Sequence, residues 1–139
     1  MADSLSPEQR SWNMSRIKSK DTSIEVKVRK YLFAKGFRFR KNDRRYPGKP
    51  DVVLPKYHTM IFVHGCFWHR HPGCKRATFP STRQEYWLRK FERNIENDRE
   101  HKEQLEAAGW NVIILWECEI NSQFEKIMKQ TVDEIIKGR

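Results

Sequence analysis

Apolar residues recur at helical spacing in three parts of the chain, and this pattern predicts three helices. The first covers residues 22–36, where Thr22 is a suitable N-cap and Gly36 suits the C-terminal turn. The second covers residues 81–108 and opens with a sequence of capping-box form. The third covers residues 122–136. The predicted inward faces of the second and third helices contain Trp87, Phe91, Ile95 and Leu105, and then Phe124, Ile127, Met128, Val132, Ile135 and Ile136.

Alternating or continuous apolar runs predict four strands, over residues 37–40, 51–54, 57–63 and 110–116. Only Pro55 and Lys56 separate the second strand from the third, so these two strands are predicted to form an antiparallel hairpin. That pairing would bring Asp51, which begins one strand, close to His64, which follows the other. The order of the elements predicts an α/β domain with a mixed sheet flanked by helices.

The charge pattern adds a candidate partner to this single domain, residues 1–139. Of the formal net charge of +10, residues 1–50 carry +9, from 14 Lys and Arg against 5 Asp and Glu. Residues 1–22 are predicted to form a basic N-terminal arm with a short helix that starts at Ser6-Pro7. A basic block on an otherwise balanced domain indicates a polyanion such as nucleic acid, although a solubilising surface has the same composition. The chain has neither a membrane-spanning apolar run nor a signal core, which predicts a location in the cytosol.

A short segment after the third strand contains most of the metal-ligand residue types. The spacing Cys66-x4-His71-x2-Cys74 is a metal signature, and Cys118 follows the last strand. These four residues form the Cys3His set of a structural zinc site, and they use every cysteine of the chain. The alternative is three buried free cysteines and a surface histidine.

A second site of harder ligands is predicted around Asp51. Glu25, His64, His69 and Asp98 are able to converge on it, and Asp98 is an acid on an apolar helical stripe. One or two carboxylates with retained waters suit Mg2+, which activates water for phosphodiester hydrolysis, and a nearby histidine can accept the proton. On the residues alone, the preferred interpretation of Glu25 is a first-turn acid stabilised by the helix dipole, and one of the histidines can be a supporting residue.

Three aromatic residues near these ligands have two interpretations. Phe67 and Trp68 are adjacent in the metal-binding segment, and Trp87 lies in the first turn of the long helix. Each can belong to the core, or it can insert between base pairs as the apolar wedges of DNA-bending proteins do.

These residues together resemble the very short patch repair (Vsr) family of DNA mismatch endonucleases. The resemblance covers residues 10–119 and rests on a specific set of motifs. They are residues 14–22 (Met-Ser-Arg-Ile-Lys-Ser-Lys-Asp-Thr), Glu25, 47–51 (Pro-Gly-Lys-Pro-Asp), 62–69 (Phe-Val-His-Gly-Cys-Phe-Trp-His), 80–83 (Pro-Ser-Thr-Arg), Tyr86, Trp87, Asn94, Asp98, Gly109, Trp110 and 116–119 (Trp-Glu-Cys-Glu). Ile24 departs from the proline that many relatives have there. The acid-x-lysine motif common in nucleases of this fold is absent after Asp51, where the family has histidines.

The resemblance implies a restriction-endonuclease-like fold with structural zinc, and a Mg2+-dependent nick 5′ of the thymine in T·G mismatches that arise from deaminated 5-methylcytosine. It implies that Asp51 and the backbone carbonyl of Val63 bind Mg2+ and that His69 is the general base. The other implied roles are support of the metal waters by His64, Glu25 and Asp98, insertion into DNA by Phe67, Trp68 and Trp87, and zinc ligation by Cys66, His71, Cys74 and Cys118.

The resemblance also implies double-stranded DNA as substrate, a cytosine-5 DNA methyltransferase as functional companion and, by analogy, a MutL-type repair coordinator. A single asymmetric nick requires only a monomer. Two alternatives stay open at this point: a restriction-type endonuclease of the same fold that cuts an unmismatched site, and a non-catalytic, zinc-stabilised DNA-binding module. Mere binding gains nothing from acids that face phosphates, which counts against the binding module.

Overall fold

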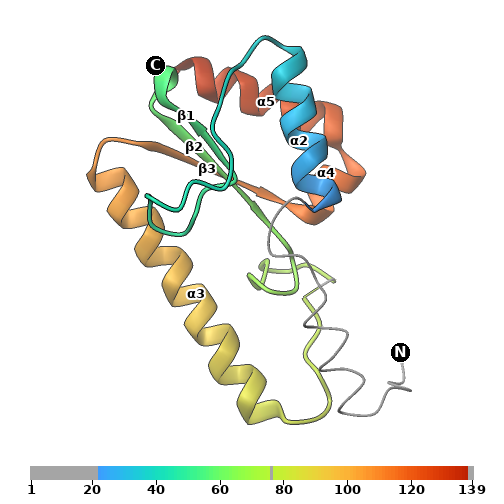
Figure 1. Ribbon diagram of the computed structural model, residues 1–139. Helices are drawn as coiled ribbons and strands as arrows, with labels where there is room; N and C mark the ends of the chain where they lie inside the picture. Colours follow the sequence, from blue (N-terminus) through green and yellow to red (C-terminus); the bar gives the residue numbers. More distant parts are fainter. Residues whose placement is uncertain (1–21, 76, 138–139) are drawn as a thin grey trace.

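In the computed structural model, residues 22–75 and 77–137 are described (Figure 1). The predicted N-terminal arm lies outside these residues, apart from Thr22. The elements are α2 (Ser23–Ala34), β1 (Val52–Leu54), the 3-10 turn η1 (Pro55–Tyr57), β2 (Thr59–His64), α3 (Gln84–Ala107), β3 (Asn111–Trp116), α4 (Glu117–Ser122) and α5 (Phe124–Lys137).

The sheet has the order β1-β2-β3 and is mixed, as predicted. β1 and β2 are antiparallel, with Val52 opposite Ile61, whereas β2 and β3 are parallel from the Thr59–Asn111 pair to the His64–Trp116 pair. The carboxyl ends of β2 and β3 therefore meet at one edge of the sheet. The start of β1 lies at the same edge because the hairpin reverses the chain.

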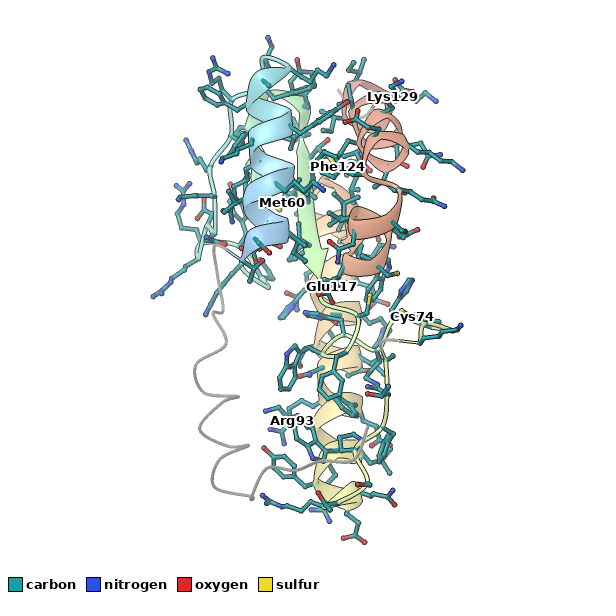
Figure 2. The ribbon with its side chains drawn as sticks, turned by 90° about the vertical axis from the view of Figure 1, so that its right-hand side faces the viewer. Met60, Cys74, Arg93, Glu117, Phe124 and Lys129 are labelled. Carbon is teal, nitrogen blue, oxygen red and sulfur yellow. The ribbon has the colours of Figure 1, made fainter. Side chains whose placement is uncertain are left out.

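Helices cover both faces of the sheet. α2, α4 and α5 lie together on one face, and α3 crosses from the other face and extends well beyond the strands (Figures 1 and 2). The larger core lies between the sheet and the first group of helices, and it contains Val28, Leu32, Phe37, Val52, Leu54, Ile61, Val63, Ile113, Leu115, Ile120, Met128 and Ile135. A smaller cluster on the α3 side consists of Val53, Met60, Phe62, Leu105 and Val112.

α2 begins and ends as its sequence predicts. The hydroxyl of Thr22 accepts a hydrogen bond from the Glu25 amide, and the Glu25 carboxylate accepts one from the Thr22 amide, which completes a capping box. Gly36, just past the helix, has φ of +94°, a left-handed conformation that glycine adopts without strain.

One predicted strand is absent, and another begins later than predicted. Residues 37–40 form no strand, because Arg40 makes a single bridge with Val53 before the chain leaves the sheet. β2 begins at Thr59 rather than at residue 57, because the proline at residue 55 has no N–H to donate to the ladder and opens a 3-10 turn.

The helix predictions need four corrections. α3 begins at Gln84, where Arg83 is an N-cap with φ of 53° and makes no side-chain cap bond, so the capping-box pattern at residues 81–84 is not used. Ile95 and Ile136 are 49% and 55% exposed rather than inward. Residues 117–122 form α4, a short helix that periodicity did not indicate; its Ile120 is fully buried in the larger core.

Candidate active site and metal centre

Asp51 lies at the sheet edge where the hairpin prediction placed it. Its side chain is buried, and its Oδ2 accepts a hydrogen bond from the Val63 amide at 2.6 Å. Burial raises the pKa of this carboxyl to about 7; the Val63 N–H opposes that rise, and the nearby carboxyl of Glu25 adds to it. A divalent cation at this point would remove the cost of holding a buried carboxylate ionised.

Glu25 reaches the same place from α2. It is buried, it closes the capping box with Thr22, and its Oε2 lies 3.2 Å from Nη2 of Arg29, one turn further along the helix. The Glu25 side chain therefore caps the first turn of α2 and also lies beside Asp51 in the candidate site. Sequence reasoning missed Arg29, although the spacing of four residues between an acid and an arginine was a visible signal.

His64 and His69 stack face to face beside these acids. Their ring centroids are 3.8 Å apart and their planes differ by 6°. Burial, reinforced by the neighbouring His69, lowers the pKa of His64 to about 3, so this imidazole stays neutral. Within the described residues, Nδ1 of His64 has no hydrogen-bond partner although it is buried. An unpaired buried acceptor or donor at this point suits the waters of a bound cation.

α3 fixes the orientation of His69. Nδ1 of His69 lies 2.6 Å from Oδ2 of Asp98, and Nδ2 of Asn94, one turn earlier, donates to the carbonyl of Trp68 at 3.0 Å. Asp98 is thus the paired acid that its place on an apolar stripe indicated. With its proton on Nδ1, His69 has Nε2 available as an acceptor.

One cleft of about 910 Å³ joins all of these groups. Its lining includes the five predicted residues Glu25, Asp51, His64, His69 and Asp98, together with the aromatic residues Phe67 and Trp68. Cationic side chains also line it, namely Arg44, Lys49, Lys90 and Lys102. Acids in the interior and cations around them suit a phosphodiester whose reacting phosphate meets a metal ion while its neighbours meet lysine and arginine.

The predicted aromatic residues form a ring cluster where the segment after β2, which contains predicted zinc ligands, meets α3. Phe67 contacts Trp68, Trp87 and Phe91 at centroid distances of 5.1, 6.0 and 5.3 Å. Trp87 is only 7% exposed and stacks on Phe91, so in this structure it belongs to the packed cluster, whereas Phe67 and Trp68 are half-buried and reach the cleft.

The second predicted cluster is also assembled. Ligand atoms of Cys66, His71, Cys74 and Cys118 all lie within 4.8 Å of one another, and all three cysteines are free thiols. Nδ1 of His71 is 3.6 Å from Sγ of Cys66 and 3.3 Å from Sγ of Cys118. Tetrahedral zinc, with bonds of about 2.0 to 2.3 Å, requires donors at about these separations. The donor set therefore fits zinc.

Neighbouring groups orient this cluster and bury its thiols. Trp116 stacks on the His71 ring at 4.3 Å, and the Cys118 amide donates to Sγ of Cys66 at 3.4 Å. Burial raises the pKa of the Cys66 thiol to about 12, and burial also raises that of Cys118. A bound cation would offset this cost, because zinc binds thiolates and displaces their protons. The glutamate next to Cys118 was not predicted; Oε1 of Glu117 accepts from the Cys66 amide at 3.3 Å.

Comparisons with known proteins agree with this geometry. The family model described as DNA mismatch endonuclease Vsr matches residues 2–76, more than half of the chain. The DNA mismatch endonuclease Vsr of Escherichia coli is 41% identical over 134 residues, which are 96% of this chain and 85% of that protein. The chain belongs to the Vsr family of DNA mismatch endonucleases.

Other Vsr-like relatives are named for nicking. The Type II nicking enzyme V.NmeAIP of Neisseria meningitidis is 43% identical over 137 residues, which are 99% of this chain and 96% of that protein. The Type II nicking enzyme V.XorIIP of Xanthomonas oryzae is 43% identical over 121 residues, covering 87% of this chain and 88% of its own. The family relationship makes this chain a nuclease that acts on DNA. No helix among residues 22–75 and 77–137 has the length and apolar character needed to cross a membrane.

Proposed function

We propose that this Vsr-family nuclease makes a Mg2+-dependent nick in duplex DNA on the 5′ side of the thymine in a T·G mismatch. The observation that carries the proposal is the convergence of Asp51, Glu25, His64 and the His69–Asp98 pair on one cleft rimmed by cations. This arrangement supplies oxygen ligands for a hard cation and an oriented base within the same space.

The residues divide the chemistry among them. Asp51 and the backbone carbonyl of Val63 would hold Mg2+, which when bound activates water and neutralises charge on the attacked phosphate. Asp98 would accept a hydrogen bond from Nδ1–H of His69, which leaves Nε2 to take the proton of the attacking water. The neutral ring of His64 stacks on His69 and limits its movement, and its unpaired Nδ1 and the Glu25 carboxylate can hold metal-bound waters.

We also propose a structural zinc ion at Cys66, His71, Cys74 and Cys118. Three of these ligands lie in the segment after β2 and the fourth lies just after β3, so the ion would tie that segment to the sheet. His69 lies in the chain between the ligands Cys66 and His71, and zinc would therefore hold the backbone of this base in a fixed position relative to Asp51.

Recognition of the mismatch is proposed for Phe67 and Trp68, the two aromatic residues of the cluster that are half-buried and reach the cleft. Insertion of such side chains between base pairs unstacks the duplex, which costs least at a mismatch. Trp87 would support the wedge from behind. A cytosine-5 DNA methyltransferase would be the companion enzyme, a MutL-type protein is a possible coordinator, and a monomer is sufficient for the single nick.

The test uses four duplexes of one sequence that differ at a single pair, T·G, C·G, T·A or C·A, with each strand end-labelled in turn. The proposal predicts a nick 5′ of the T in the T·G duplex alone, in Mg2+ and not in its absence. Because relatives are named Type II nicking enzymes, equal cutting of the C·G duplex is the informative contrary result and would make this a site-specific nuclease of unmismatched DNA. Binding without cleavage in Mg2+ or Mn2+, across several flanking sequences, would reject the enzyme.

A further inference from the structure

Arg29 places a buried guanidinium beside the acids of the cleft. Only 6% of the residue is exposed, although arginine seldom lies in a protein interior without a specific partner. Its Nε donates to the backbone carbonyl of Asp51 at 3.4 Å, and its Nη2 donates to Oε2 of Glu25 at 3.2 Å and to Oδ1 of Asn42 at 3.4 Å. One side chain thus joins α2, the residue before β1 and the segment between them.

These contacts hold two acids that belong to different elements. Glu25 is fixed to α2, and Asp51 is fixed to the sheet edge by the Val63 amide. Both residues line the same cleft, so their ionised carboxylates repel each other, and this repulsion favours conformations in which they lie further apart. The guanidinium opposes that repulsion because it neutralises the Glu25 carboxylate and at the same time donates a hydrogen bond to the backbone carbonyl of Asp51. Stability alone would be served as well by an apolar side chain at residue 29, since buried ion pairs seldom exceed apolar packing in net stability.

We propose that Arg29 is a positioning residue for the divalent-cation site. Its planar guanidinium group holds the Asp51 backbone and the Glu25 carboxylate in fixed relative positions before the cation binds. The inference rests on the proposed cation site at Asp51 and extends it to a residue that does not touch the cation. Preorganisation of this kind lowers the cost of assembling ligands during binding.

The planar geometry of the guanidinium group, and not only its charge, is needed to contact both Asp51 and Glu25. Lysine in place of Arg29 retains the positive charge and most of the volume, but a single ammonium cannot reproduce the directions of Nε and Nη2. Arg29→Lys therefore separates geometry from electrostatics. The matched control is Arg99→Lys on α3, where an arginine also contacts a carboxylate four residues away, in Glu103, but is half exposed to solvent.

The experiment measures Mn2+ binding to the zinc-loaded protein in the absence of DNA, from the electron paramagnetic resonance signal of free Mn2+. The Asp51→Ala variant measures how much Mn2+ binds at sites other than Asp51. Loss of one well-directed hydrogen bond corresponds to about fivefold in an equilibrium constant, so the Kd for Mn2+ should rise about fivefold in Arg29→Lys and stay unchanged in Arg99→Lys. In nicking assays the Mg2+ concentration at half-saturation should rise by the same factor, whereas the rate at saturating Mg2+ stays within about threefold.

A merely structural Arg29 gives a different result, in which Arg29→Lys lowers the melting temperature but leaves the Kd for Mn2+ unchanged. That result would overturn the inference while leaving the proposed function intact. If Arg29→Lys does not fold, Asn42→Gly removes one acceptor of the guanidinium and tolerates the left-handed φ of 49° at this residue, and it should raise the Kd about twofold, a partial loss of the same kind; an unchanged Kd again overturns the inference. If Asp51→Ala binds Mn2+ and nicks DNA as the unaltered chain does, the proposed site itself is wrong.

Discussion

Replacement of Asp51 by asparagine should stabilise the metal-free protein and slow its nicking of the T·G duplex by roughly a thousandfold. Burial raises the pKa of this carboxyl from 3.8 to about 7, so the folded protein binds its proton more tightly than the unfolded chain. The associated stability is complete below pH 3.8 and is lost as the pH rises through about 7. At 1.36 kcal/mol per pH unit, the full difference is about 4 kcal/mol at pH 8.

Asparagine does not titrate, and its Oδ1 can accept the Val63 N–H that Asp51 now accepts at 2.6 Å. Its NH2 group needs an acceptor that the carboxylate does not need, and this offsets part of the gain. We therefore expect Asp51→Asn to be about 2 kcal/mol more stable than the unaltered protein at pH 8, and the advantage to shrink toward pH 4.

The assay is urea unfolding followed by tryptophan fluorescence, at several pH values, in buffers freed of Mg2+ without chelators so that bound zinc is retained. Saturating Mg2+ should reduce the difference, because it stabilises only the chain that has the carboxylate. A variant that is less stable than the unaltered protein at pH 8, or a difference that does not change with pH, would refute the account of Asp51 as a buried, ionisable ligand.

Three further perturbations test other parts of the site. Asp98→Asn should slow nicking of the T·G duplex by about 100-fold or more, because the amide lacks the charge that stabilises a protonated His69 and its NH2 group can donate to Nδ1 and favour the wrong tautomer. Zinc content should not change, and a rate within a few-fold of the original would exclude the pair from catalysis. Cys118→Ser should lose the bound zinc, measured by inductively coupled plasma mass spectrometry, and full zinc content would remove Cys118 from the ligand set. Trp87→Ala should cost about 3 to 5 kcal/mol in urea unfolding and Trp68→Ala clearly less, since only Trp87 is fully packed; equal costs would contradict the division between support and wedge.

The sequence predicted the parts of the site that depend on short-range chain geometry. The ligands Cys66, His71 and Cys74 lie within nine residues, so their convergence needs only a compact loop. Asp51 and His64 meet because the short connection over residues 55–58 makes β1 and β2 an antiparallel hairpin, which brings the start of β1 and the end of β2 to one edge. Cys118 lies beside the other three candidate zinc ligands because β3 runs parallel to β2 and ends at the same edge of the sheet.

The missed features depend on contacts between distant segments. Arg29 has the spacing of a solvent-exposed ion pair, and only the packing of the 41–50 segment and Asp51 against α2 buries it. Ile95 follows the helical period correctly, yet it is 49% exposed. α3 extends well beyond the strands, so the sheet does not cover the whole length of its apolar face (Figure 1). Residues 117–122 carry no apolar period of their own, and α4 forms because Ile120 completes the core.

Two measurements on Asp51→Asn with the T·G duplex test most directly whether the chemistry occurs at the Asp51 cleft. Binding of the duplex in the absence of Mg2+ is measured by fluorescence anisotropy, and single-turnover nicking is measured in saturating Mg2+. The account predicts unimpaired binding, with a Kd within about threefold of the original, and nicking slower by roughly a thousandfold, because the ligand that places the cation is lost from an intact fold. Nicking at a comparable rate by this variant would show that the chemistry does not occur at the Asp51 cleft.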